Sequence, residues 1–270
     1  MVQIFAEKIK KKHLFSIITP TYNRPLKLKK QYLNLKKIKR KQLIEWILVV
    51  ENRDIETIKI IKTFKNIKKR VVFNTGGLNK AFTNGAKKAS GKYLSFLGDD
   101  DRLSINSLAT IEKIIIKKDP EWIIGQSCYT NNNTKIRKNI TKIKNFLLKN
   151  FNRNILMIVN FIMTPSSFAK KKMYEKSNYF DATHWYGNDY VCWIKFSKIC
   201  KPIVLNKIIT YVHYDDNTKS GSYDYKRFIK LYYNISKETN NYVIKLFQFL
   251  CISYILLHNF FFKKIKKLFK

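Results

Sequence analysis

The chain has 270 residues, and its 54 lysines and arginines against 18 acidic residues give a formal net charge of +36. Because 45% of the residues are hydrophobic and 14% are aromatic, the chain can bury a core, which excludes a disordered polycation. The charge permits nucleic acid, an anionic membrane surface or a phosphorylated substrate as partner. Lysine exceeds arginine throughout, with no element rich in arginine and aromatics, so we expect no nucleic-acid partner.

Strands and helices are predicted to alternate from residue 14 to about residue 128. Strands are expected where β-branched and apolar residues cluster, and helices where apolar residues recur at helical spacing. The predicted strands cover 14–19, 44–50, 70–73, 92–97 and 121–126. The predicted helices cover 26–35, 55–64, 82–89 (ended by Gly91) and 105–116. This alternation predicts an α/β fold with a doubly wound, mostly parallel sheet flanked by helices.

The second half of the chain has a less regular pattern. Residues 131–144 are polar and basic and are predicted to form a connection, and 190–199 form an apolar amphipathic stretch. A strand is predicted over 203–212, followed by a polar loop over 215–222. Residues 223–270 are predicted to form a helical C-terminal extension.

Cysteine spacing and the N-terminus bear on the compartment. The four cysteines are scattered without a C-x-x-C pair, so neither a zinc site nor a disulfide scaffold is expected. Segment 1–13 is predicted to be a basic tail, and the short apolar run after it resembles a strand more than a secretory signal. We therefore expect a cytoplasmic protein.

Three consecutive carboxylates, Asp99, Asp100 and Asp101, follow the strand predicted over 92–97. Adjacent acids repel one another, whereas Mg²⁺ and Mn²⁺ prefer oxygen ligands and leave coordination positions for substrate phosphates. The alternative is a polar turn before the next helix, with Ser104 as its N-cap, but a cap needs only one such side chain. The triplet thus favours a metal–diphosphate site.

Two further polar clusters follow predicted strands, namely residues 19–23 (TPTYN) and Glu51 with Asn52. In a parallel sheet the carboxyl ends of the strands meet at one edge, where ligands of such folds bind. The clusters and the acid triplet are therefore expected to share one binding edge.

Three segments, in this order, resemble family-2 glycosyltransferases of the GT-A fold. They are FSIITPTYNRP from residue 15, GGLNKAFTNGAKKASGKYLSFLGDDD from residue 76, and SSFAKKKMYEKSNYFD from residue 166 with GNDYVCWIKFSK from residue 187. The resemblance covers about 15–222. Departures from the family pattern are Glu51-Asn52 for an acidic pair, Thr83 for an asparagine, and Asn188-Asp189 for Glu-Asp.

The resemblance implies an inverting, metal-dependent enzyme that moves a sugar from a nucleotide-diphospho-sugar to an acceptor hydroxyl in surface glycan or polysaccharide synthesis. The catalytic domain would cover 14–222, with a nucleotide-sugar half at about 14–128 and an acceptor half at about 129–222. The acceptor would be a glycan or a lipid-linked molecule. The rival hypotheses are a non-catalytic basic protein of the same fold that binds membrane or nucleic acid, and a nucleotidyltransferase.

The resemblance also assigns roles to residues. Asp189 is the candidate general base, with an N-cap role as the alternative. The candidate ligands for Mn²⁺ or Mg²⁺ are Asp99, Asp101 and His213. The candidate acceptor-binding residues are His184, Trp185 and Asn188. The candidate donor-binding residues are Thr19, Pro20, Thr21, Tyr22, Asn23, Arg24, Glu51, Asn79, Lys80, Asp99 and Asp100. For Tyr22, Arg24, Lys80 and His213, a solvated surface position is the alternative.

Residues 243–262 are almost wholly apolar and aromatic, and five lysines follow between Lys263 and Lys270. Polar residues interrupt the run, so an interfacial helix on an anionic membrane is favoured over a spanning helix. The enzyme would then be peripheral at the inner face of the cytoplasmic membrane. The alternative is a helix that packs on the catalytic domain or on a second subunit of an oligomer.

Overall fold

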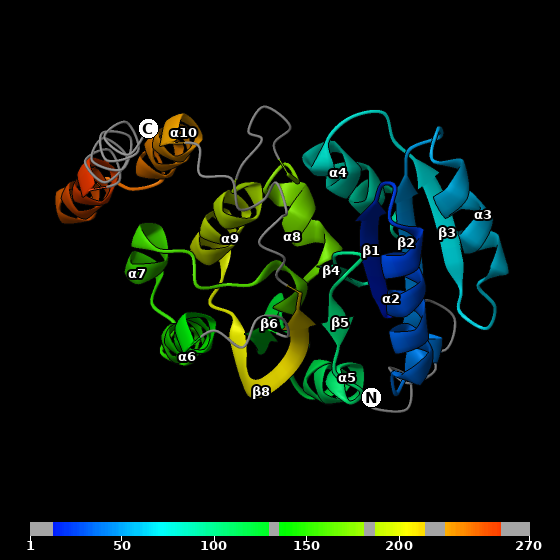
Figure 1. Cartoon of the computed structure of the whole chain (residues 1–270). Coiled ribbons are helices and arrows are strands. Elements are labelled where there is room, and N and C mark those ends of the chain that lie inside the picture. The colour runs from blue at the N-terminus through cyan, green and yellow to red at the C-terminus, as the bar shows by residue number, and fades with distance from the viewer. Residues whose placement is uncertain (1–12, 130–134, 181–186, 214–224, 255–270) are drawn as a thin grey trace.

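The computed structural model describes residues 13–129, 135–180, 187–213 and 225–254 (Figure 1). An eight-stranded sheet has the order β3-β2-β1-β4-β7-β6-β8-β5. Its strands are β1 (Phe15–Thr21), β2 (Ile44–Val50), β3 (Lys69–Phe73), β4 (Tyr93–Phe96), β5 (Arg102–Leu103), β6 (Trp122–Tyr129), β7 (Ser167–Lys170) and β8 (Ile203–Val212).

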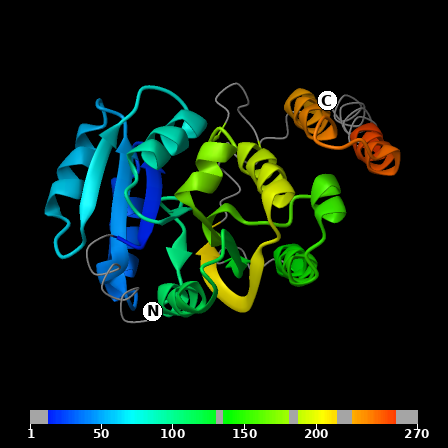
Figure 2. The same cartoon turned by 180° about the vertical axis from the view of Figure 1, so that it is seen from behind.

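Helices cover both faces of this sheet (Figures 1 and 2). The first five, in chain order, are α2 (Pro25–Lys37), α3 (Ile55–Thr63), α4 (Leu78–Lys88), α5 (Ser107–Lys118) and α6 (Lys135–Lys149). The others are α7 (Arg153–Ile158), α8 (Lys171–Lys176), α9 (Asn188–Ile199) and α10 (Tyr225–Ser236), with 3₁₀ turns at Lys41–Leu43 and Thr164–Ser166. Residues 242–254 are also helical. No helix in the described ranges is both long and apolar enough to cross a membrane.

Alternating side chains of the buried strands divide the interior into two cores. Ile17 of β1 belongs to the core shared with α2, α3 and α5, whereas its neighbour Ile18 belongs to the core shared with α4, α6, α7, α8 and α9. Every residue of β2 is buried, as expected for a strand covered on both faces. The result is a three-layer α/β/α arrangement, as the strand pattern predicted.

The sheet is mixed and mostly parallel. β1 pairs in parallel with β2 and β4, β2 with β3, and β6 with β8, while β7 runs antiparallel between β4 and β6. The pattern over 166–181 predicted no strand there, because β7 has only four residues, all buried, and shows no alternation. β5, with two residues, was missed for the same reason.

Three local predictions from the sequence are wrong. Residues 135–144, predicted to belong to a connection, lie in α6, whose Leu148 is buried, because dense lysines hid the apolar face of this helix. The N-cap of α5 is Asn106, so Ser104 does not cap it. Helix α4 ends at Lys88, and Gly91 instead lies against β1, where a Cβ atom would come within 2.6 Å of the Ser16 nitrogen.

Candidate functional site

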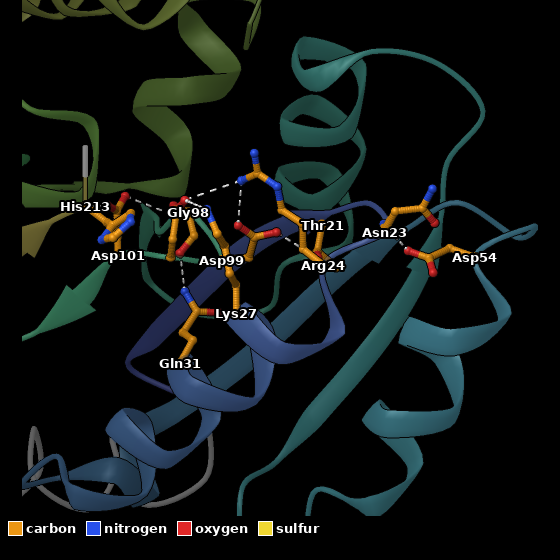
Figure 3. Close-up of polar contacts among 11 residues, drawn as sticks. Thr21, Asn23, Arg24, Lys27, Gln31, Asp54, Gly98, Asp99, Asp101 and His213 are labelled. Carbon is orange, nitrogen blue, oxygen red and sulfur yellow. Dashed lines mark hydrogen bonds and ion pairs between the residues drawn. The ribbon is translucent and has the colours of Figure 1, made fainter. Parts of the chain in front are cut away.

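The candidate site lies where the strand order reverses. The chain moves outward from β1 to β2 and β3 and then returns to form β4 on the other side of β1. In open α/β sheets, ligands usually bind at such a reversal, outside the carboxyl ends of the strands. The sequence placed TPTYN and the acid triplet at these two strand ends, and the structure joins them (Figure 3).

A hydrogen bond from Thr21 Oγ1 to Asp99 Oδ2, 2.9 Å long, connects the two strand ends. Arg24, at the N-cap of α2, donates from Nη1 to Asp99 Oδ1 at 3.1 Å and lies 3.4 Å from Asp100 Oδ2. Lys27, one turn further along α2, pairs with Asp100 Oδ2 at 3.1 Å. Two basic side chains of one helix thus face two acids of the triplet (Figure 3).

Asp101 is held by backbone amides. Gly98 N–H donates to its Oδ2 at 3.2 Å, and His213 N–H, at the end of β8, donates to its Oδ1 at 3.0 Å. Gln31 of α2 donates to the Gly98 carbonyl, and the Asp101 amide donates to the same oxygen at 3.1 Å. The side chain of Asp101 is therefore fixed in direction by two segments far apart in sequence.

Burial perturbs both outer acids of the triplet. Burial raises the pKa of Asp99 above its usual value, against the opposing charge of Arg24. Burial and the charge of Asp100 raise the pKa of Asp101 to about 7. Carboxylates kept close together and out of water favour either a proton or a cation.

Whether the site could bind a divalent cation depends on which side-chain atoms are available as ligands. Among the described residues, no group of three or more His, Cys, Asp or Glu side chains is arranged to hold a metal ion. A site of one or two carboxylates shared with substrate phosphates needs no such group. Asp99 and Asp101 supply hard oxygen donors of this kind at the end of β4, so the residues present fit Mg²⁺ or Mn²⁺ in that mode.

The loop after β1 is braced from the side of β2. Asn23 has a left-handed φ of 52°, and its amide donates to Asp54 Oδ2 at 2.6 Å. Asp54 is also the N-cap of α3, where its Oδ1 accepts from Thr57 N–H at 3.1 Å. Tyr22 is 56% exposed, so its ring is available to a ligand.

Other predicted donor-binding residues lie at various depths. Thr19 is fully buried and its hydroxyl accepts from Trp46 Nε1 at 3.0 Å, so its side chain faces the core and not the site. Pro20 and Glu51 are half-buried at the ends of β1 and β2. In α4, Asn79 is buried, whereas Lys80 is exposed and donates to the Thr75 carbonyl at 3.4 Å.

Asp189 lies in the first turn of α9, whose N-cap is Gly187 at a φ of 69°, so Asp189 is not the cap. Its Oδ2 accepts from Thr164 Oγ1, and its Oδ1 accepts from Tyr190 N–H at 2.8 Å. The next residue after Thr164, Pro165, accepts from Ser95 of β4 at 3.4 Å, which ties this turn to the strand that leads to the acids. The neighbouring Asn188 is buried.

The sequence analysis did not predict four residues that contribute to the site, and two of the residues that it did predict lie outside the described ranges. Nothing in the sequence indicates a site role for Lys27, because lysines are abundant throughout this chain. Gln31 and Thr164 are single polar residues that belong to no recognisable motif. Asp54 was detectable, since Asp54 and Thr57 have the spacing of a helix N-cap. His184 and Trp185 lie outside the described residues, and His213 meets Asp101 through its backbone.

Solved structures with a similar fold include S. aureus TarS 1-349 in complex with UDP-GlcNAc, with a TM-score of 0.67 and 17% identity over 90% of this chain and 71% of that one. The chain also matches a longer structure of S. aureus TarS, with a TM-score of 0.58 and 16% identity, over 90% of this chain and 42% of that one. The mannosyltransferase PcManGT from Pyrobaculum calidifontis, in complex with GDP-Man and Mn²⁺, has a TM-score of 0.59 and 12% identity over 89% and 72% of the two chains. A search of curated proteins found no match.

The family model described as glycosyl transferase family 2 matches residues 16–177, more than half of the sequence. The chain therefore belongs to glycosyl transferase family 2.

Proposed function

We propose that the protein transfers a sugar from a nucleotide-diphospho-sugar to an acceptor hydroxyl, with inversion at the anomeric carbon, in the synthesis of a surface glycan or polysaccharide. The observation that carries the proposal is the buried acid pair Asp99 and Asp101 at the strand-order reversal, within this family. The similar structures of TarS and PcManGT contain UDP-GlcNAc and GDP-Man, which are donors of this class.

The donor binds along the ends of β1, β2 and β4. Tyr22 stacks on the base, Asn23 and Glu51 form hydrogen bonds to base or ribose, and Asp100 reaches the ribose. Arg24 and Lys27 lie within 3.4 Å of the acids and are the nearest cations for the diphosphate oxygens. The remaining proposed donor residues are Thr21, Asn79 and Lys80.

Asp99 and Asp101 would hold Mn²⁺ or Mg²⁺, with His213, whose amide donates to Asp101, next to them after β8. Such an ion supplies Lewis-acid neutralisation of the negative charge that grows on the departing diphosphate. The burial that raises the pKa of both acids also keeps water away from the leaving group. The similar structure of PcManGT contains Mn²⁺ together with its sugar nucleotide, which supports a divalent ion in this reaction.

Asp189 removes the proton from the acceptor hydroxyl. Thr164 and the Tyr190 amide fix its carboxylate, so one oxygen can take the proton while the acceptor oxygen attacks the anomeric carbon. The new glycosidic bond forms as the bond to the diphosphate breaks on the opposite face, which inverts the configuration. Asn188, with His184 and Trp185, would line the acceptor side.

We place the reaction at the inner face of the cytoplasmic membrane, where a lipid-linked acceptor would be available. The charge of +36 suits the anionic cytoplasmic leaflet.

The test is a thermal-shift screen of UDP, GDP, CDP and TDP with and without Mn²⁺, followed by turnover of the matching sugar nucleotides. One diphosphate should raise the melting temperature, and the rise should need the metal. If no diphosphate stabilises the protein in either condition, the proposed donor class is wrong.

A further inference from the structure

The helix at residues 242–254 presents an unusual surface. Seven of its side chains, all apolar or aromatic, are half or more exposed: Tyr242, Val243, Leu246, Phe247, Phe249, Leu250 and Tyr254. At 100° per residue these positions occupy an arc of roughly 160°. A helix on the surface of a soluble domain normally turns such an arc inward and leaves charged residues outside.

The opposite side of the same helix is fixed to the body of the protein. Ile244 is 5% exposed and belongs to the core that includes α9, and Gln248 donates from Nε2 to the Met157 carbonyl at 2.8 Å. That carbonyl lies at the end of α7, beside the Leu156 and Ile158 carbonyls, which accept from Tyr190 of α9 and Tyr232 of α10. The contacts of Ile244 and Gln248 therefore direct the apolar arc away from the domain. The helix itself lies at the outer edge of the molecule (Figures 1 and 2).

The charge around this arc favours an anionic bilayer over a second copy of the chain as the partner that covers it. Lys245 borders it, with Nζ 6.0 Å from the Tyr242 ring centroid, and Lys237 lies 4.2 Å over the Tyr233 ring on the same end of the molecule. After Glu238 the sequence has no acidic residue, whereas it has six lysines: Lys245, Lys263, Lys264, Lys266, Lys267 and Lys270. A second copy would bring another charge of +36 against this surface. An anionic bilayer attracts the lysines and accepts the aromatic side chains at its headgroup level.

We propose that the outward arc of residues 242–254 is a docking surface for an anionic lipid bilayer, with its aromatic side chains in the headgroup region and Lys237 and Lys245 on acidic headgroups. The same helices lie against the acceptor side, since Leu231 of α10 packs on Gly187 at the start of α9. Docking through this arc therefore orients the first turn of α9, and with it Asp189, relative to the membrane.

The test is co-flotation of the full-length chain with vesicles of phosphatidylglycerol and phosphatidylcholine, or of phosphatidylcholine alone. The variant Phe247→Ser/Phe249→Ser/Leu250→Ser removes three side chains that are 50–62% exposed, so the fold should survive. The matched control Phe73→Ser/Ile105→Ser/Ile116→Ser removes three side chains that are 51–57% exposed on other elements. Melting temperatures without lipid verify that both variants are folded.

Wild type and control should float with anionic vesicles. The arc variant should partition into them about 10- to 100-fold less, because it has less apolar surface to transfer from water into the membrane. Binding to phosphatidylcholine alone should be weaker, and salt should reduce the anionic binding. Equal flotation of the arc variant and wild type, or no flotation of wild type, overturns the proposal.

A wild-type dimer in sedimentation that the arc variant abolishes would also overturn it, in favour of a second copy. The inference rests on the membrane location proposed above but not on sugar transfer. Flotation needs no sugar nucleotide, so the two experiments are independent. A failed flotation assay would leave the sugar-transfer proposal standing, and a failed diphosphate screen would leave the docking surface standing.

Discussion

At the scale of single residues, the site depends on side chains that the backbone holds in place. Asp101 is 8% exposed and accepts from two amides, so its carboxylate lies inside the protein and not at an open strand end. Asp99 is tied to β1 through Thr21. These contacts limit which substitutions test function without damaging the fold.

We expect Asp101→Asn to abolish turnover and the Mn²⁺-dependent part of nucleotide binding. An asparagine also points an NH₂ group at one of the two amide donors, which should cost about 1–3 kcal/mol of stability. Thermal shift with and without Mn²⁺ measures both effects. The control is Asp119→Asn, because Asp119 lies outside the triplet and forms ion pairs with Lys92 and Lys170. This variant should retain the Mn²⁺-dependent rise in melting temperature. A metal-dependent shift of wild-type size in Asp101→Asn would refute the metal assignment.

Asp189→Asn should lower the rate by about 10²–10⁴-fold with donor binding nearly unchanged, because a positioned proton acceptor contributes this much. Thr164→Val, which only frees the carboxylate from one hydrogen bond, should have a smaller effect. Initial rates and donor affinity from titration separate the roles. A parallel collapse of donor affinity would assign Asp189 to the donor site or to the fold.

At the scale of elements, β1, β2 and the segment before β4 are joined by a buried acid. Glu45 of β2 is 2% exposed, and its Oε2 accepts from Ser16 of β1 and from both the amide and the hydroxyl of Ser90, each at 2.8 Å. Arg70 of β3 lies 3.3 Å from its other oxygen. Burial alone would raise the pKa of Glu45, but the Ser90 and Ser16 hydrogen bonds and the Arg70 charge outweigh it and hold the pKa below its usual value.

Because the folded-state pKa of Glu45 is lowered, its contribution to stability is present above the unfolded pKa of about 4.3 and is lost as the pH falls through the folded value. We expect Glu45→Gln to lower the free energy of unfolding by about 1–2 kcal/mol at pH 7. The difference from wild type should shrink between about pH 5 and pH 3. Urea titrations measure this, with exposed Glu175→Gln as control. A difference that stays constant with pH would contradict the role of the charge.

At the scale of the whole molecule, the C-terminal helices belong to the fold as well as to the surface. The sequence left two alternatives for the apolar tail, membrane contact or packing on the domain. Within residues 242–254 the helix packs on the domain through Ile244 and Gln248, while seven of its apolar and aromatic side chains are half or more exposed. Removal of this helix therefore does more than remove a membrane contact.

Deletion of residues 242–270 should lower the free energy of unfolding by about 2–4 kcal/mol, because within the described residues 242–254 it removes the buried Ile244 and the hydrogen bond of Gln248. Nucleotide binding should persist, because the proposed donor site lies after β1 and β4, whereas residues 242–254 contact α7 through Gln248. Urea unfolding and diphosphate titration of the truncated protein are the measurements. A truncated protein as stable as wild type would mean that the packing of Ile244 and Gln248 contributes nothing.

Features that depend on a local pattern of residues could be predicted from the sequence. Buried strands such as β2 are continuous apolar runs, and three acids after a strand are conspicuous in a basic chain, so the fold class, the family and the meeting of residues 19–23 with the acid triplet could be predicted. The specific roles of the site residues, apart from their placement, remain predictions.

Individual contacts between segments far apart in the sequence could be seen in the folded chain but not predicted. The Thr21–Asp99 hydrogen bond spans 78 residues and the contact between His213 and Asp101 spans 112, and neither leaves a pattern within a local window. The antiparallel β7 is too short to show a period, and the lysines of α6 conceal its apolar face. The orientation of helix 242–254 was undetermined for a related reason: apolar residues on all sides of a helix carry no information on which side packs, and that is fixed by Met157, more than 80 residues earlier.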